Sequence, residues 1–275
     1  MQETAPPERH FVHMFARVVL VIAALGCGSA EPSKPGTVPP GSVVAPVVGF
    51  SKRTSAADGI TIPYQAWAPQ DFVVTRRWPI VVALAGTGER GSDGDKQITV
   101  GMGPLVQSQP NFPAVVVFPQ IPIDESGRLA FDKAVYQIVN DVIRDYNGDA
   151  DRVYLAGLSY GGTEAFNLLY GDARPFAAFL SAASGICARC IQNGASLDVA
   201  HTLVAQKLKT FPIWMFQGDQ DTSSPVANAR GLRDAFQAAG ATSFKYTEYA
   251  GADHLIWDRV YATPAVWDWV FAQRR

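Results

Sequence analysis

Short apolar segments alternate with helical segments from residue 47 to residue 275. The clearest is residues 79–85, Pro-Ile-Val-Val-Ala-Leu-Ala, in which every residue is apolar. A strand that is apolar on both faces is typical of a parallel sheet covered by helices on both sides. Similar runs recur at 114–118, 153–156, 177–180 and 213–216, with an edge strand expected at 244–249. We therefore predict one α/β domain with a doubly wound, mostly parallel sheet.

The intervals between these runs have helical character. The predicted helices are residues 129–146, 163–170, 199–208, 225–239 and 263–272. Ahead of them, residues 47–50 and 60–67 are predicted to be two strands joined through Asp58-Gly59, a common hairpin dipeptide. The chain has 275 residues, 48% of them hydrophobic, and can bury a sizeable core. We expect residues 47–275 to form this domain without a large cap domain.

The first 27 residues have the features of a secretory leader. Nine apolar residues, 18–26, separate Arg17 from Cys27. As a helix they would rise about 13 Å, less than half of the roughly 30 Å hydrocarbon core, so this run is too short to span a membrane. Its length is typical of a signal peptide. Its end, Ala-Leu-Gly-Cys, resembles the bacterial lipobox, in which the cysteine is lipidated.

We expect residues 1–27 to be a lipoprotein signal peptide with Cys27 as the lipid anchor. Residues 28–46 contain five prolines and have the composition of a linker. The protein is then an exported bacterial lipoprotein of the outer membrane, periplasm or cell surface. The alternatives are cleavage near Cys27 without lipid and a buried N-terminal strand in which the cysteine is incidental. Two start sites are open, Met1 and Met14. A start at Met14 would give a leader without Glu3 and Glu8.

The segment Gly157-Leu158-Ser159-Tyr160-Gly161 lies directly after one predicted strand and before a predicted helix. A serine on such a sharp turn is held in a strained conformation with its hydroxyl above the strand ends. The glycines remove side chains that would collide where strand and helix approach. A G-x-S-x-G pattern alone is weak evidence, so the strand-turn-helix position carries the inference. We predict that Ser159 is a nucleophile.

A serine hydroxyl needs a base, and the chain has four histidines. His10 and His13 lie in the predicted leader. His201 lies among apolar residues of a predicted helix, where a packed or surface side chain is expected. His254 lies in a loop after the last predicted strand, where hydrolases with a G-x-S-x-G turn place their base. His254 is therefore the predicted base.

An acid is needed to orient the imidazole. Asp221 follows the predicted strand 213–216 and is our choice, with Asp219 as the alternative acid. Asp253 is disfavoured because neighbouring loop residues seldom point the same way. The chain order Ser159, Asp221, His254 is that of the α/β-hydrolases.

Two backbone donors are expected to stabilise the oxyanion. One is the N–H of Tyr160, the residue after the nucleophile. The other is expected from the glycine-rich loop after residue 85, with Thr87 preferred and Gly88 next. Glu89 and Arg90 are predicted to brace this loop, and recognition of a substrate carboxylate by Arg90 is the alternative.

Residues 79–92, PIVVALAGTGERGS, resemble the "PLVVFLHGxGERGS" segment of bacterial exported esterases and predicted peptidases. That group is the carboxylesterase and polyhydroxybutyrate-depolymerase-like branch of the α/β-hydrolases. Residues 254–261 are similar to its "HxxWDxxY" ending. Further matches are Asp58-Gly59, Ile62-Pro63-Tyr64, Phe118-Pro119-Gln120, Asp151–Tyr154 and Gly157–Gly162. The resemblance implies the α/β-hydrolase fold and an ester hydrolase whose triad is Ser159, Asp221 and His254.

The chain departs from this branch at one position. The histidine that precedes the glycine-rich loop, and that braces it in the family, is Ala85 here. Near the other end of the matches, Trp257 and Tyr261 are expected to pack the final helix on the sheet, with an acyl pocket as the alternative.

Cys187 and Cys190 form a C-x-x-C pattern between two predicted strands. In an exported protein this pattern favours a local disulfide that stiffens the loop beside the active site. Redox chemistry is the reading for a cytosolic protein. A zinc site would need two further ligands, and we expect no metal.

We therefore expect a serine esterase that needs no cofactor and acts on a small-molecule or polymer-borne ester through an acyl-enzyme. The alternatives are a peptidase with the same triad and a non-catalytic cell-surface binding protein on the same scaffold. The formal net charge of −2 provides no basic field for nucleic acid. Membrane contact is expected only through the N-terminal lipid.

Overall fold

The computed structural model describes residues 46–124 and 127–275. The predicted signal peptide, its Cys27 and residues 28–45 of the predicted linker lie outside the described residues. The strands are β1 (Gly49–Ala57), β2 (Ile60–Ala68), β3 (Trp78–Leu84), β4 (Val115–Pro119), β5 (Gly148–Leu158), β6 (Ala178–Ala182), β7 (Ile213–Gly218) and β8 (Phe244–Tyr249). The α-helices are α1 (Met102–Ser108), α2 (Arg128–Asp145), α3 (Tyr160–Asp172), α4 (Ala188–Ile191), α5 (Leu197–Leu208), α6 (Val226–Ala238), α7 (Trp257–Tyr261) and α8 (Pro264–Ala272).

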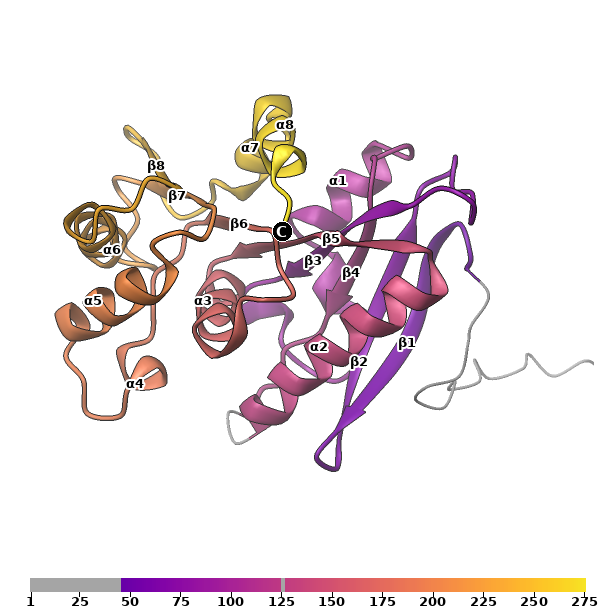
Figure 1. The fold of residues 1–275 in the computed structure, drawn as a ribbon, viewed down its shortest axis with the longest axis horizontal. Coiled ribbons are helices and arrows are strands. Elements are labelled where there is room, and N and C mark those ends of the chain that lie inside the picture. The colour runs from indigo at the N-terminus through magenta and orange to yellow at the C-terminus, as the bar shows by residue number, and fades with distance from the viewer. Residues whose placement is uncertain (1–45, 125–126) are drawn as a thin grey trace, which may run out of the picture. The chain divides into compact units, whose positions relative to one another are not determined.

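These strands form one sheet in the order β1-β2-β4-β3-β5-β6-β7-β8 (Figure 1). Each pair of adjacent strands from β4 through β3, β5, β6 and β7 to β8 is parallel. Strand β2 is antiparallel to both β1 and β4. The mostly parallel sheet of the sequence prediction is confirmed, with β8 at one edge and the β1–β2 hairpin at the other.

Side chains of β3 alternate between the two faces of the sheet. Ile80 and Val82 pack with α2, α3, α5 and α6 on one face, and Val81 and Ala83 pack with α1, α7 and α8 on the other. Figure 1 shows these two helical layers on opposite sides of the sheet. Because both faces are covered, the central strands are apolar throughout, as expected for a parallel sheet.

Two strands extend beyond the predicted ranges into polar sequence. Strand β1 continues to Ala57 because Arg53 is buried against α2, where its Nη1 lies 2.9 Å from Asp145 Oδ2 and its Nη2 donates to Tyr146. Strand β5 begins at Gly148 with polar residues, and there Asp149 is buried with an ion pair to Arg152. Buried ion pairs thus replace the apolar pattern on which the prediction depended.

Helices α1 and α7 are absent from the prediction. Each is short, seven and five residues, and α1 contains Gly103 and Pro104, which are poor helix formers. Both lie on the face of the sheet that buries Val106 and Val260. Tertiary packing rather than local preference therefore explains these helices.

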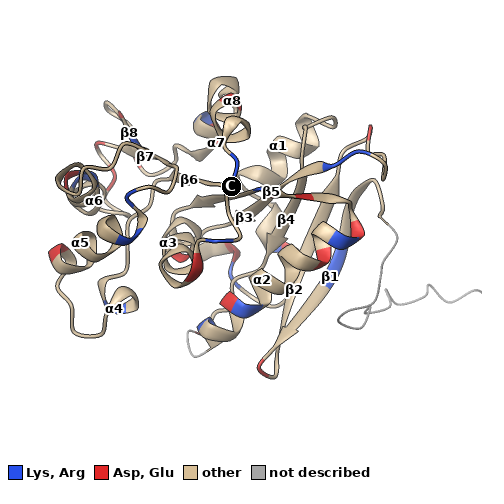
Figure 2. Ribbon diagram, viewed as in Figure 1, with Lys and Arg blue, Asp and Glu red and all other residues tan. Residues whose placement is uncertain are grey.

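Acidic and basic residues are mixed along the same elements of the described chain (Figure 2). Helix α2 carries both signs, and many pairs on the surface are in contact, such as Lys133 with Asp58. Among the described residues, we find no helix that has both the length and the apolar composition for crossing a bilayer.

Candidate active site

The predicted nucleophile, Ser159, lies on a sharp turn between β5 and α3. Strand β5 ends at Leu158, α3 begins at Tyr160, and Ser159 between them has φ 51° and ψ −124°. A positive φ is strained for a residue with a side chain. The elbow fits because its glycines lie in tight contacts: a Cβ on Gly161 would be 2.2 Å from Leu84 O, and one on Gly157 would be 2.7 Å from Gly162 Cα.

The structure brings together the three residues predicted as a triad. Ser159 Oγ lies 2.9 Å from His254 Nε2, and His254 Nδ1 lies 2.7 Å from Asp221 Oδ2. They come from three separate segments, after β5, after β7 and after β8. This convergence follows from the parallel sheet, because the carboxyl ends of these strands meet at one edge.

Asp221 is held as an acceptor of four hydrogen bonds. Its side chain is fully buried, and Oδ1 accepts from the backbone N–H groups of Ser223 and Ser224 at 2.9 and 2.8 Å. Oδ2 accepts from Gln217 Nε2 at 2.8 Å and from His254 Nδ1. These four bonds hold the Asp221 side chain so that it faces the histidine. The proton of the neutral imidazole is then on Nδ1, which leaves Nε2 as the acceptor for the Ser159 hydroxyl.

The alternative acid, Asp219, has another structural role. Its Oδ1 accepts from Gly251 N at 2.7 Å, which fastens the loop before His254. Asp253 bonds to Leu255 N within its own turn. The loop with His254 also lies against the end of β7, since a Cβ on Gly218 would be 2.2 Å from Asp253 O.

Two residues near His254 differ in their surroundings. Tyr261 is buried in the apolar layer between α7 and the sheet, and burial raises its pKa. Trp257 instead meets the imidazole edge-on, with ring centroids 5.4 Å apart. Trp257 therefore helps to limit the positions open to His254.

His201 is buried, and its Nε2 lies 2.9 Å from Asn228 Oδ1, away from the triad.

The predicted oxyanion donors are at the starts of two helices. Tyr160 is the first residue of α3, and Thr87 and Gly88 are the first two of a 3₁₀ helix, η1 (Thr87–Glu89). Backbone N–H groups at a helix start point outward along the axis and can bind an anion. The η1 loop begins against the nucleophile, since a Cβ on Gly86 would be 3.5 Å from Ser159 Cβ.

Arg90, which directly follows η1, braces this loop against the segment after β4. Its Nε donates to Pro122 O at 3.0 Å, its guanidinium also bonds to Ile123 O, and it lies 4.5 Å from the centre of the Tyr160 ring. This arrangement agrees with the bracing interpretation for Arg90. Glu89 is not its partner in an ion pair among the described residues.

Sequence reasoning missed two glutamines that support the site. Gln217 bonds to Asp221. Gln120 bonds to Glu89 at the end of η1 and to Gly94 in the loop that follows. Both are fully buried at the end of a strand. A glutamine at an apolar strand end was the available signal for both, because burying an amide requires partners for it, and Gln120 also lies in the Phe118-Pro119-Gln120 match.

Cys187 and Cys190 are joined as a disulfide at the start of α4. The segment before it is fixed by Asn228 of α6, which bonds to both the N–H and the C=O of Ile186. In the described part of the chain, no group of three or more His, Cys, Asp or Glu side chains is placed to hold a metal ion.

No family model and no curated protein matches the chain. Its fold is similar to that of a thermostable esterase, with a TM-score of 0.68 and 29% identity over 82% of this chain and 63% of that one. It is also similar to a feruloyl esterase module from Clostridium thermocellum, with a TM-score of 0.61 and 14% identity over 85% and 94% of the two chains. A dipeptidyl peptidase 4 from Porphyromonas gingivalis has a TM-score of 0.61 and 14% identity over 75% and 32%.

The chain has the α/β-hydrolase fold. It spans less than two thirds of the thermostable esterase and about a third of the dipeptidyl peptidase. These α/β-hydrolase neighbours, together with the strained serine between β5 and α3, support a serine hydrolase of this class. In an α/β-hydrolase the nucleophile, acid and base follow in the order found here.

Proposed function

We propose that this α/β-hydrolase cleaves carboxylic esters through an acyl-enzyme intermediate. Ser159 is the nucleophile, His254 the general base and Asp221 the group that orients it. The observation that carries this proposal is the continuous chain of hydrogen bonds from Ser159 Oγ through the imidazole to Asp221. Its two distances, 2.9 and 2.7 Å, are within the range for proton transfer and for orientation of the base.

In the first half-reaction, Ser159 Oγ attacks the ester carbonyl carbon while His254 Nε2 takes the hydroxyl proton. The imidazolium that forms is stabilised by the buried Asp221 carboxylate. The carbonyl oxygen becomes negatively charged and accepts from the Tyr160 N–H and from the Thr87 N–H, or from Gly88 next to it. The C–O bond then breaks, and His254 gives its proton to the leaving alcohol.

In the second half-reaction, water attacks the acyl-enzyme with His254 Nε2 again as the base. The tetrahedral intermediate collapses to the carboxylic acid, and the proton returns from His254 to Ser159 Oγ. All of these steps use groups of the chain and water.

A peptidase with the same triad is the second candidate. It is supported by the similarity to dipeptidyl peptidases, although the chain spans only about a third of their length. Ester cleavage is the better supported reaction because the neighbour with the highest identity of those described is an esterase. A panel of p-nitrophenyl esters and aminoacyl p-nitroanilides separates the two, since only a peptidase turns over both.

The direct test compares ester hydrolysis by the wild type, Ser159→Ala and Ser108→Ala. Ser108 is a matched control, because its hydroxyl only bonds to Leu105 O at the end of α1. We expect hydrolysis by the wild type and Ser108→Ala and a loss of at least about 10³-fold in Ser159→Ala. A wild type without turnover would favour a binding protein on the same scaffold.

We also propose that the enzyme is anchored in a bacterial membrane by a lipid on Cys27. The short apolar run before Cys27 and the proline-rich segment after it support this proposal. Expressed from its own leader, the protein should fractionate with membranes, and Cys27→Ala should release it. Equal fractionation of the two proteins would contradict the anchor.

A further inference from the structure

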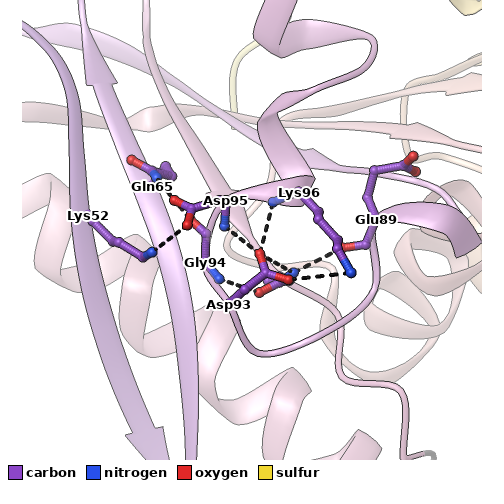
Figure 3. Close-up of polar contacts among 8 residues, drawn as sticks. Lys52, Gln65, Glu89, Asp93, Gly94, Asp95 and Lys96 are labelled. Atoms are coloured by element: carbon purple, nitrogen blue, oxygen red, sulfur yellow. Dashed lines mark hydrogen bonds and ion pairs between the residues drawn. The ribbon is translucent and has the colours of Figure 1, made fainter.

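A buried glutamine helps to fasten the loop that carries the proposed oxyanion donor, together with Arg90. Gln120 directly follows β4, and its side chain is fully buried. Its Oε1 accepts from Gly94 N at 2.7 Å, and its Nε2 donates to Glu89 O at 3.1 Å and to Asp93 Oδ1 at 3.2 Å. Figure 3 shows Glu89, Asp93 and Gly94 arranged around this junction. One amide thus joins both ends of the segment that follows η1.

Asp93 organises the same segment. Its Oδ1 accepts from the backbone N–H groups of Asp95 and Lys96 at 2.8 and 3.0 Å (Figure 3). These bonds lower the pKa of Asp93 to about 2, so its carboxylate is charged at neutral pH. The main chain adds a parallel tie, from Gly91 N to Ile121 O at 3.0 Å.

The partners of Gln120 fix which way its amide points. Gly94 N–H can only donate, so it requires the oxygen, and Glu89 C=O can only accept, so it requires the nitrogen. An amide offers one acceptor and one donor together at every pH, whereas a carboxyl group of the same length can donate only when it is protonated. A methionine would leave both backbone groups without a partner, and a charged glutamate would be unable to donate to Glu89 O.

The opposite side of the loop has no comparable tie. Ala85 presents only a methyl group, beside a cavity of about 10 Å³ that is also lined by Gln97. Gln97 is buried, and neither polar atom of its side chain has a hydrogen-bond partner among the described residues. Among the described residues, η1 is therefore held mainly by bonds to residues 120–123, which follow β4.

We propose that Gln120 is a positioning residue for catalysis. By holding Glu89, the last residue of η1, it fixes the direction in which the Thr87 and Gly88 N–H groups meet the oxyanion. This inference rests on the proposed esterase function. It predicts that loss of the Gln120 amide lowers kcat, because the displaced donors matter most when charge develops on the oxygen.

The test compares Gln120→Met with Gln65→Met in the full-length protein, using p-nitrophenyl acetate. Gln65 is a matched control: it is buried and donates to Gly94 O at 2.8 Å, in the same loop but farther from η1. We expect a decrease in kcat of about 10- to 100-fold in Gln120→Met with KM within about two-fold. Gln65→Met should keep kcat within about three-fold.

A second variant, Gln120→Glu, adds a readout that general destabilisation would not move. When protonated, this glutamate can donate to Glu89 O. The nearby Asp93 carboxylate should raise the pKa of the introduced carboxyl group above its usual value. The ratio of kcat/KM in Gln120→Glu to that in the wild type should therefore rise as the pH falls from about 8 to about 5.

Three results would overturn the role of Gln120. These are an unchanged kcat in Gln120→Met, an equal loss in Gln65→Met, or a Gln120→Glu ratio that does not depend on pH. In each, a wild type with Ser159-dependent turnover leaves the esterase proposal standing. A wild type without such turnover overturns both proposals.

Discussion

His254 Nδ1 lies 2.7 Å from Asp221 Oδ2, whereas Asp219, two residues earlier, bonds to the backbone of Gly251 instead. The two aspartates share a loop, but their expected contributions to catalysis differ greatly in size. In the proposed mechanism, Asp221 stabilises the imidazolium that forms when Ser159 attacks. Asp219 only fastens the loop that precedes His254.

We predict that Asp221→Asn lowers kcat by about 10³- to 10⁴-fold, because the amide stabilises neither the imidazolium nor the tautomer that leaves Nε2 free to accept. Asp219→Asn should lower kcat by less than about ten-fold. Steady-state ester hydrolysis by the two variants checks this. Equal losses would show that the acid was assigned to the wrong residue.

Substitution of Gly161 is expected to disrupt folding at the elbow. A Cβ there would lie 2.2 Å from Leu84 O and 2.4 Å from Ala85 O, which are backbone atoms of the central sheet and the oxyanion loop. Gly161→Ala should cost about 3 kcal/mol or more of unfolding free energy, or prevent folding. Gly171→Ala is the control in the same helix, because a Cβ on Gly171 would lie 3.8 Å from its nearest neighbour, Tyr136 Oη. The control should change the free energy of unfolding by less than about 1 kcal/mol. Urea unfolding of the two variants measures both changes.

Reduction of the Cys187–Cys190 disulfide should have a limited effect. The disulfide closes a very short loop, so its entropic contribution to stability is about 2 kcal/mol. Asn228 holds the preceding residue Ile186 independently. After treatment with dithiothreitol, we expect a lower melting temperature while Ser159 remains reactive. Loss of serine reactivity on reduction, or in Cys187→Ser, would show that this loop shapes the site directly.

Asp132 should make the protein less stable as pH rises. Burial in α2 and the nearby charge of Glu164 raise the pKa of Asp132 to about 7. The unfolded chain, with a pKa of about 3.9, loses that proton first, so unfolding free energy falls between about pH 4 and pH 7. Asp132→Asn should flatten this dependence, as measured by melting temperatures across the range. Asp71→Asn, at an exposed carboxylate, should leave it unchanged.

The central sheet was predictable because burial on both faces requires an unbroken apolar run, as in residues 79–85. The polar strand β1 was predicted only in part because Arg53 is buried with a partner, Asp145, that is distant in sequence. The same limit explains the missed helix α7, whose five residues are held by packing on the sheet.

The proximity of Ser159 and His254 was predictable because the proposed chemistry allows few residue types, and only one histidine remained in a suitable loop. The choice between Asp219 and Asp221 was left open because both are acidic and lie on the same loop. Gln120 and Gln217 were not predicted, because a glutamine supports a site only through partners that the fold brings to it.

Covalent labelling of Ser159 tests the esterase proposal most directly. The protein is treated with a fluorophosphonate, and intact mass and peptide mapping are compared for the wild type, His254→Ala and Ser159→Ala. We predict a single adduct on Ser159 in the wild type, a much slower reaction in His254→Ala and none in Ser159→Ala. An unlabelled wild type, or an adduct that persists in Ser159→Ala, would contradict the proposed mechanism.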